Sequence, residues 1–167
     1  MLRKSRRYAL KSSEAKTVLS KASERLGVNM SNFFDAKVAV EVVETGKGEL
    51  LLMNRKPLMF RVSEDVYPTL VFDEFLKTLP KMVVDMGAIR HVCNGADIMA
   101  PGIVRIEGEF TKGALVLVVD VQHGKRLALG EAQLGAEDAK AVKKGIVVKN
   151  VHFVGDEIWN AMRELVT

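Results

Sequence analysis

The sequence predicts an α+β N-terminal domain, in which helices pack on a small antiparallel sheet, followed by a mostly β domain with a compact barrel-like sheet. Three observations lead to this fold class. A strong helical pattern near the start is followed by three strand patterns with turn residues between them. The second half holds several short strand patterns, separated by turn residues and two short helical patterns. The 167 residues are enough for two small domains.

The first domain is predicted to contain one long helix and a sheet for it to cover. Residues 6–10 can form a short edge strand, and residues 14–26 have the apolar spacing of a helix. Ser12 and Ser13 are suitable N-caps for this helix, and Gly27 follows it as a C-terminal glycine. Three strand patterns follow, at residues 37–43, 49–53 and 58–62. The first half is therefore α+β.

Pro80 marks the predicted end of the first domain, because a short helix that Asp73 can cap ends there. We therefore expect an N-terminal domain at 1–80, a second domain at 81–156 and a C-terminal helical turn at 157–167. The expected elements of the second domain are a strand that begins at 83, a helix at 88–93, a short strand with Ile98, strands at 114–121, 126–132 and 146–153, and a short helix in which Ala139 and Val142 face inward.

The stretch from Gly87 to Ile103 is the most informative part of the sequence, because it predicts a helix, a turn and a strand in close succession. Gly95 follows the helix and can take the left-handed conformation without a Cβ penalty, so the chain can reverse directly into the strand. Pro101 has no amide hydrogen for a sheet ladder, and Gly102 lets backbone or ligand approach closely. These residues indicate a surface that is made largely of backbone.

The same stretch resembles the signature of the PUA domain, named for pseudouridine synthases and archaeosine transglycosylases. The resemblance rests on Gly87-Ala88-Ile89, on residues 94–103, and on 145–153, which resemble the closing strand of that domain. Tyr67-Pro68-Thr69-Leu70, just ahead of it, is similar to the archaeal-type two-domain proteins of the malignant T-cell-amplified sequence and ligatin family. The resemblance implies a PUA pseudo-barrel and an RNA-binding protein of translation. Its expected partners are tRNA 3′ ends or rRNA, the small ribosomal subunit and an initiation-type factor.

In that family the helix–strand junction is the part that faces RNA. Small residues would allow close backbone approach, apolar side chains would contact bases, cations would bind phosphates, and one carboxylate would accept from a base edge or a 2′-hydroxyl. The small residues are Gly95, Ala96 and Gly102, and the apolar ones are Met99 and Pro101. The cations are Arg90, Lys144 and Lys149, and the carboxylate is that of Asp97. The alternative is that Gly95, Ala96 and Pro101 only fold the junction, and both roles can hold at once.

Positive charge is concentrated in the first half. Residues 1–80 contain 14 Lys and Arg against 10 Asp and Glu, whereas residues 81–167 contain 11 of each, so the whole net charge of +4 comes from the first half. Its densest part is the N-terminal cluster, Arg3, Lys4, Arg6 and Arg7. Such a cluster attracts a polyanion, so we expect it to add phosphate contacts, the alternative being a solvated terminal strand.

The sequence gives little support for catalysis, a metal or a membrane segment. Cys93 is the only cysteine, and His91 lies two residues before it, so the two would point to different sides of a helix. The three histidines have no ligand spacing, and we expect no metal or cofactor. The longest apolar run, residues 114–119, is far shorter than the roughly 20 residues of a membrane helix. We therefore expect a cytoplasmic protein that is not an enzyme.

Two other functions stay open at this stage. One is an accessory RNA-binding subunit of a tRNA or rRNA modification enzyme, and the other is a protein-interaction module without RNA binding. The sequence leaves undetermined which RNA is bound, because no aromatic residue is an evident base-stacking platform.

Overall fold

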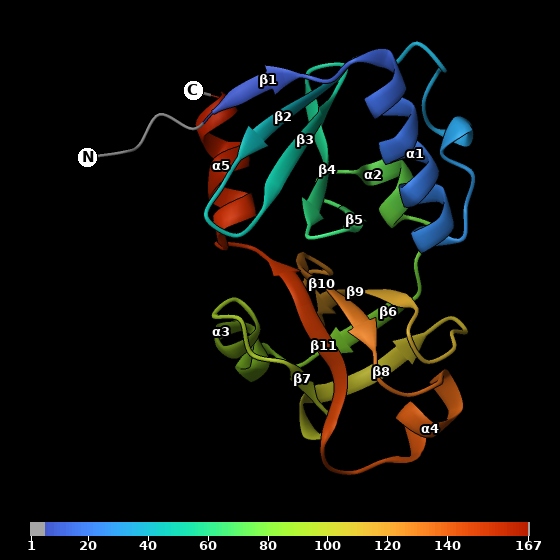
Figure 1. The fold of residues 1–167 in the computed structure, drawn as a ribbon. Coiled ribbons are helices and arrows are strands. Elements are labelled where there is room, and N and C mark those ends of the chain that lie inside the picture. Colours follow the sequence, from blue (N-terminus) through green and yellow to red (C-terminus); the bar gives the residue numbers. More distant parts are fainter. Residues whose placement is uncertain (1–5, 167) are drawn as a thin grey trace. The chain divides into compact units, whose positions relative to one another are not determined.

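The computed structural model describes residues 6–166, which fold as two compact units (Figure 1). The N-terminal unit consists of residues 6–75 together with 157–166, and the C-terminal unit consists of residues 76–156. The last helix, α5 (Glu157–Val166), therefore folds with the start of the chain, where it packs against strand β3 (Glu49–Met53). Ile158 and Met162 of this helix are buried. The segment that the sequence indicated as a helical turn is thus a helix of ten residues.

The N-terminal unit is built on a five-stranded antiparallel sheet. Its strands are β1 (Arg7–Ala9), β2 (Val40–Glu44), β3, β4 (Lys56–Val62) and β5 (Asp65–Pro68), and they are adjacent in chain order. Helix α1 (Ser12–Leu26) packs against β5, and a 3₁₀ turn, η1 (Met30–Asn32), follows it. Four successive residues of β3, Leu50 to Met53, are fully buried, so both faces of the sheet are covered at its centre. The predicted α+β class is confirmed.

Two predictions for the N-terminal unit are wrong in detail. Ser12 and Ser13 are the first residues of α1 and not its caps, because the N-cap is Lys11, whose N–H donates to the Glu14 carboxylate at 3.1 Å. The sequence also missed strand β5, which is short, ends in a proline and lies at the sheet edge, where a missing N–H is tolerated. Gly27 is confirmed as the left-handed C-terminal glycine, with φ of 68°.

The C-terminal unit is a curled, six-stranded mixed sheet that forms a half-barrel. Its strands are β6 (Lys81–Val84), β7 (Ile98–Met99), β8 (Ile103–Glu107), β9 (Leu115–Asp120), β10 (Arg126–Ala132) and β11 (Ile146–Phe153), in the spatial order β7-β11-β10-β9-β6-β8. All pairs are antiparallel except β6 with β9. The core between the strands includes Val116, Val118, Ala128 and Val147, all fully buried. The predicted barrel-like class is confirmed.

Short helices connect the strands of this unit. The short helix α2 (Asp73–Leu76), most of which belongs to the N-terminal unit, precedes β6 in the chain. The helix expected at 88–93 is a 3₁₀ turn, η2 (Met86–Ala88), that runs into a single α-helical turn, α3 (Ile89–Val92). A further 3₁₀ turn, η3 (Ala100–Gly102), follows β7. The helix α4 (Ala136–Ala141) ends before Val142, which is extended and 37% exposed, so the prediction that Val142 faces inward is wrong. The sequence did not indicate β8, an edge strand whose apolar residues are only partly buried.

Candidate functional site

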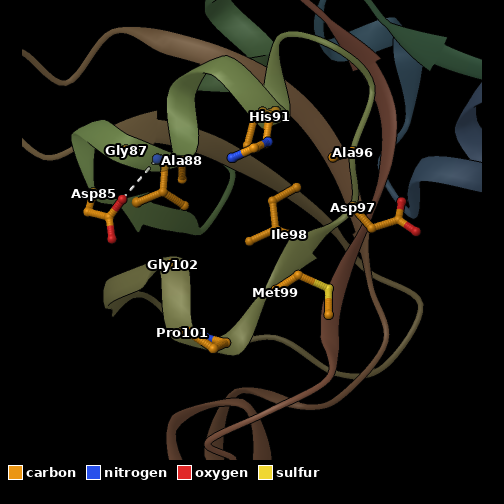
Figure 2. Close-up of a pocket in the computed structure, with 12 residues that line it drawn as sticks. Asp85, Gly87, Ala88, His91, Ala96, Asp97, Ile98, Met99, Pro101 and Gly102 are labelled. Atoms are coloured by element: carbon orange, nitrogen blue, oxygen red, sulfur yellow. Dashed lines mark hydrogen bonds between the residues drawn. The ribbon is translucent and has the colours of Figure 1, made fainter.

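A cleft of about 490 Å³ opens in the C-terminal unit between η2, α3 and the segment from β7 to η3 (Figure 2). Val84, Val92 and Ile98 are its buried apolar lining residues, and Asp85 and His91 are polar ones. Five of the residues that the sequence assigned to RNA contact also line it: Ala96, Asp97, Met99, Pro101 and Gly102. The predicted junction is therefore a concave surface. Its volume lies within the roughly 300–1,000 Å³ of small-molecule sites.

Asp85 holds the two walls of the cleft together. Its carboxylate Oδ1 accepts from the Ala88 N–H at 2.9 Å, which fixes the start of the η2–α3 wall. Its own N–H donates to the Gly102 carbonyl at 3.0 Å, which fixes η3 on the other side. Within residues 6–166, no donor contacts the second carboxylate oxygen of Asp85. Asp85 is thus the N-cap of η2, and its place in the cleft depends on the fold.

The turn between α3 and β7 needs a glycine for two reasons. Gly95 has φ of +93°, as the sequence predicted, and its N–H donates to the Val92 carbonyl at 3.1 Å. The next N–H, that of Ala96, donates to the His91 carbonyl at 3.0 Å. A Cβ on Gly95 would also lie 3.2 Å from the Phe153 ring. Both the backbone conformation and the available space therefore exclude a larger residue.

Asn150 on β11 ties this turn to the sheet. Its side-chain amide donates to the carbonyls of Val92 and Ala96, each at 3.0 Å, and its backbone N–H donates to Asp97 Oδ1 at 2.9 Å. Asp97 thus has a structural contact in addition to the RNA contact that we expected. Figure 2 shows its carboxylate directed away from Asp85 and His91. The sequence analysis missed Asn150, for which the only signal is an amide residue within a strand rich in β-branched residues.

An exposed apolar pair includes Met99, which lines the cleft. Met99 is 46% exposed, and Ile146 is 48% exposed and is its cross-strand partner in the β7–β11 pair. The Ala100 N–H donates to the Gly145 carbonyl at 2.9 Å and so holds the loop before β11 beside η3. Met99 therefore presents the apolar surface that its predicted role requires. Ile146 was missed because only the strand register places it there.

The three predicted phosphate-binding cations lie outside the cleft. Arg90 is exposed on α3, Lys144 is exposed in the loop before β11, and Lys149 is exposed on β11, where Glu131 is its cross-strand partner. None of the three lines the cleft itself. Their contact with phosphates stays a prediction.

The predicted N-terminal cluster is only partly described. Arg3 and Lys4 lie outside the described residues. Arg6 lies 3.6 Å from the Glu44 carboxylate, and its guanidinium stacks over the Tyr8 ring. Arg7 Nε donates to the Glu41 carboxylate at 2.9 Å, an ion pair that raises the pKa of Arg7 and lowers the pKa of Glu41. Carboxylates of β2 thus partly compensate two of the four charges.

Three further sites of the C-terminal unit contain titratable groups that are buried or hydrogen-bonded. Burial raises the pKa of the half-buried Cys93 thiol, which makes it a weaker nucleophile at neutral pH. The Asp120 carboxylate accepts from the N–H groups of His123, at 2.6 Å, and Lys125, at 3.0 Å, which lowers its pKa. His152 Nδ1 and Asp156 Oδ2 form a buried pair at 2.8 Å.

Residues 6–166 contain neither a cluster of candidate metal ligands nor a helix suited to a membrane. No group of three His, Cys, Asp or Glu residues in this part of the chain could hold a metal ion. None of the described helices is both long enough and apolar enough to cross a membrane.

Comparisons with known proteins match each of the two units to a domain family. A PUA domain model matches residues 80–154, and a model for a domain of unknown function, DUF1947, matches residues 6–73. The chain is 32% identical over 160 residues to malignant T-cell-amplified sequence 2 of Mus musculus, covering 90% of this chain and 88% of that protein. It is 30% identical to translation machinery-associated protein 20 of Saccharomyces cerevisiae, covering 74% of this chain and 73% of that one.

Solved structures agree with this assignment. The crystal structure of a hypothetical protein from Pyrococcus horikoshii OT3 is similar with a TM-score of 0.75 and 31% identity, covering 94% of this chain and 99% of that one. The resemblance that was inferred from the Gly87–Ile103 stretch and from Tyr67-Pro68-Thr69-Leu70 is confirmed. PUA domains bind RNA. The chain belongs to the malignant T-cell-amplified sequence family, with an N-terminal domain of the DUF1947 type followed by a PUA domain.

Proposed function

We propose that this protein binds single-stranded RNA through the cleft face of its C-terminal unit and acts in translation, where it contacts a tRNA 3′ end or rRNA on the small ribosomal subunit. Such a protein is a cytoplasmic factor of the initiation or recycling type and works together with an initiation-type protein factor. It binds and positions RNA, and it carries out no chemical step of its own.

The observation that carries this proposal is the cleft beside the α3–β7 turn. Gly87 and Gly102 expose backbone along its walls, and Met99 provides apolar surface at its rim. Arg90 is exposed on α3, one of the elements that form the cleft, and Lys144 precedes the glycine that is hydrogen-bonded to η3. Unpaired RNA is recognised by this combination, because its bases can leave the stack while cations bind its phosphates.

The relatives support the translation part of the proposal. The yeast relative carries the name translation machinery-associated protein 20, and the alignment with it covers about three quarters of each chain. The same RNA-binding surface can serve different complexes. The RNA and the protein partner must therefore be identified by experiment.

Crosslinking followed by sequencing of the bound RNA tests the proposal directly. The full chain is crosslinked in cells, and the reads are compared with those of an Arg90→Ala, Lys144→Ala, Lys149→Ala variant as a matched control. We expect enrichment at tRNA 3′ ends or at one site of small-subunit rRNA, and a loss of that enrichment in the variant. Reads that follow RNA abundance alone, or equal reads for both proteins, would contradict the proposal.

Co-purification separates translation from RNA modification. Small ribosomal subunits and an initiation-type factor should accompany the tagged protein from a gradient-fractionated extract. If an RNA-modification enzyme accompanies it in stoichiometric amount and ribosomal subunits do not, the protein is an accessory subunit of that enzyme and the translation proposal is wrong.

A further inference from the structure

The cleft contains two polar side chains, those of Asp85 and His91, that phosphate binding alone does not explain. Asp85 presents a carboxylate oxygen that no donor contacts within residues 6–166, although the other oxygen is held by Ala88. The His91 ring is exposed, lines the same cleft and has no hydrogen bond among the described residues. Figure 2 shows Asp85 and His91 on either side of Ala88, with the Ile98 side chain facing the same space. A carboxylate at this place repels phosphate, so its ligand must carry hydrogen-bond donors.

Apolar surface surrounds these polar groups. Val84, Val92 and Ile98 line the cleft from the buried side, and Ala88 and Pro101 line it nearer the surface. A planar aromatic ring fits such a lining, because it buries its faces against apolar atoms while its edge forms hydrogen bonds. Bases that have left the stack are held in this way in other RNA-binding sites.

We propose that the cleft holds one unstacked nucleobase of the bound RNA and that the free oxygen of Asp85 accepts a hydrogen bond from the exocyclic amino group of that base. This inference rests on the proposed function, because it takes RNA as the ligand, and it adds a specificity that the phosphate contacts cannot supply. The preferred bases are adenine and cytosine, and the disfavoured base is uracil.

The preference follows from the edges of the bases. Adenine and cytosine each present an amino group next to an unprotonated ring nitrogen, which matches the Asp85 acceptor and offers an acceptor to an N–H of His91. Uracil presents a carbonyl oxygen where the others have the amino group, and two acceptors facing each other repel. We assign the base-edge acceptor to Asp85 and not to Asp97, because each has one oxygen held by a backbone N–H but the Asp97 carboxylate points away from Asp85 and His91 (Figure 2).

The substitution Asp85→Asn tests this assignment without removing the structural contact. The asparagine Oδ1 can still accept from the Ala88 N–H, while its amide group places a donor where the free oxygen was. Because the change also removes one negative charge, Asp138→Asn is the matched control: Asp138 is exposed on α4 and does not line the cleft. Thermal melts of both variants verify that they fold.

Gly102→Val provides an independent test by filling the cleft. A Cβ on Gly102 would lie 3.5 Å from the Ala88 Cβ, an ordinary contact, and Gly102 does not have positive φ. The valine side chain then occupies space that the base would need. This variant should bind oligoadenylate and oligouridylate with nearly equal affinity.

The measurement is the affinity of the full chain for fluorescent oligoadenylate, oligocytidylate and oligouridylate. We expect the parent and Asp138→Asn to bind oligoadenylate and oligocytidylate more tightly than oligouridylate. Asp85→Asn should lower the ratio of these affinities to the affinity for oligouridylate about tenfold, which corresponds to the loss of one hydrogen bond to a charged group. If all proteins bind the three RNAs with the same ratio, Asp85 does not read a base and the inference is wrong, while the proposed function stands. If the parent binds none of the RNAs, both are wrong.

Discussion

The cleft of the C-terminal unit and the N-terminal cluster were both predicted to contact RNA, but their described polar side chains differ in whether they have partners within the protein. In the cleft, an oxygen of Asp85 and the His91 ring have no partner within residues 6–166. In the N-terminal cluster, Arg7 is hydrogen-bonded to Glu41, and Arg6 lies near Glu44. Charge density along a sequence therefore overstates the positive charge that is available to a ligand. Whether a group is free depends on partners that are distant in the chain.

The largest effect that we predict is on the folding of the α3–β7 turn. Replacing Gly95 with valine imposes positive φ on a β-branched residue and brings its Cβ against the Phe153 ring. We expect the free energy of unfolding to fall by roughly 2–6 kcal/mol, the sum of about 1–3 kcal/mol each for backbone strain and overpacking. Urea denaturation of the full chain measures this loss.

Gly113→Val is the matched control for this prediction. Gly113 has the same φ of +93°, but nothing lies within 4 Å of an added Cβ, so only the strain of about 1–3 kcal/mol applies. The difference between the two variants isolates the contact with Phe153. Equal losses would show that the space beside the ring is not limiting.

Loss of the Asn150 side-chain contact should lower the free energy of unfolding by a smaller amount. Asn150→Ala leaves the carbonyls of Val92 and Ala96 without their side-chain donor, which should cost about 1–3 kcal/mol. The loss is moderated because Asn150 Oδ1 is itself buried without a partner in the described part of the chain, and the substitution removes it. Thermal unfolding measures the change.

Asp97→Asn is the comparison for Asn150→Ala. The new side chain still offers Oδ1 to the Asn150 N–H, so we expect stability to change by no more than about 0.5 kcal/mol. If Asp97 has the base-edge role that the sequence predicts, this variant should also shift the preference among 3′-terminal RNA sequences. If Asp97→Asn changes that preference and Asp85→Asn does not, the base-edge acceptor is Asp97.

Arg90→Ala should weaken RNA binding without affecting the fold. Arg90 is exposed on α3, and loss of one phosphate contact lowers the slope of log affinity against log salt by about 0.7 for single strands. All RNA sequences should be affected alike. Lys140→Ala on α4 makes the same change in net charge and is the control. Equal slopes for both variants would exclude Arg90 as a phosphate contact.

The N-terminal cluster should show a weaker salt effect per charge. Neutralising Arg3, Lys4, Arg6 and Arg7 is predicted to flatten the salt dependence, because each phosphate contact contributes about 0.7 to the slope. Arg6 and Arg7 should contribute less than this value each, since their loss also exposes the carboxylates of Glu44 and Glu41. Salt titrations of the double variant Arg6→Ala, Arg7→Ala and of Arg90→Ala compare the two regions directly. If the salt slope changes more per charge removed in the double variant than in Arg90→Ala, the N-terminal cluster contributes more to phosphate binding than Arg90 does.

The sequence predicted features that depend on neighbouring residues and missed those that depend on distant ones. The bounds of β10 and β11 and the left-handed Gly95 follow from local patterns, and all three were predicted correctly. The contact of Asn150 with the α3–β7 turn joins residues more than fifty positions apart, and no local pattern indicates it. Edge strand β5 was missed because it has only four residues and ends in a proline, and edge strand β8 was missed because its exposure removes the apolar alternation that identifies a strand.

The last prediction concerns the Arg7–Glu41 pair, where we expect the smallest effect. The hydrogen bond from Arg7 lowers the pKa of Glu41 in the folded protein. A carboxylate whose pKa is lower in the folded than in the unfolded state stabilises the fold above its unfolded pKa, about 4.3 for Glu, and loses this contribution as the pH falls through the folded value. A double-mutant cycle with Arg7→Met and Glu41→Gln measures the coupling in urea denaturation. The coupling should be small but favourable at neutral pH, because both side chains are partly exposed, and it should vanish in acid below the folded pKa. A coupling that persists unchanged in acid would show that the two side chains interact by packing and not by charge.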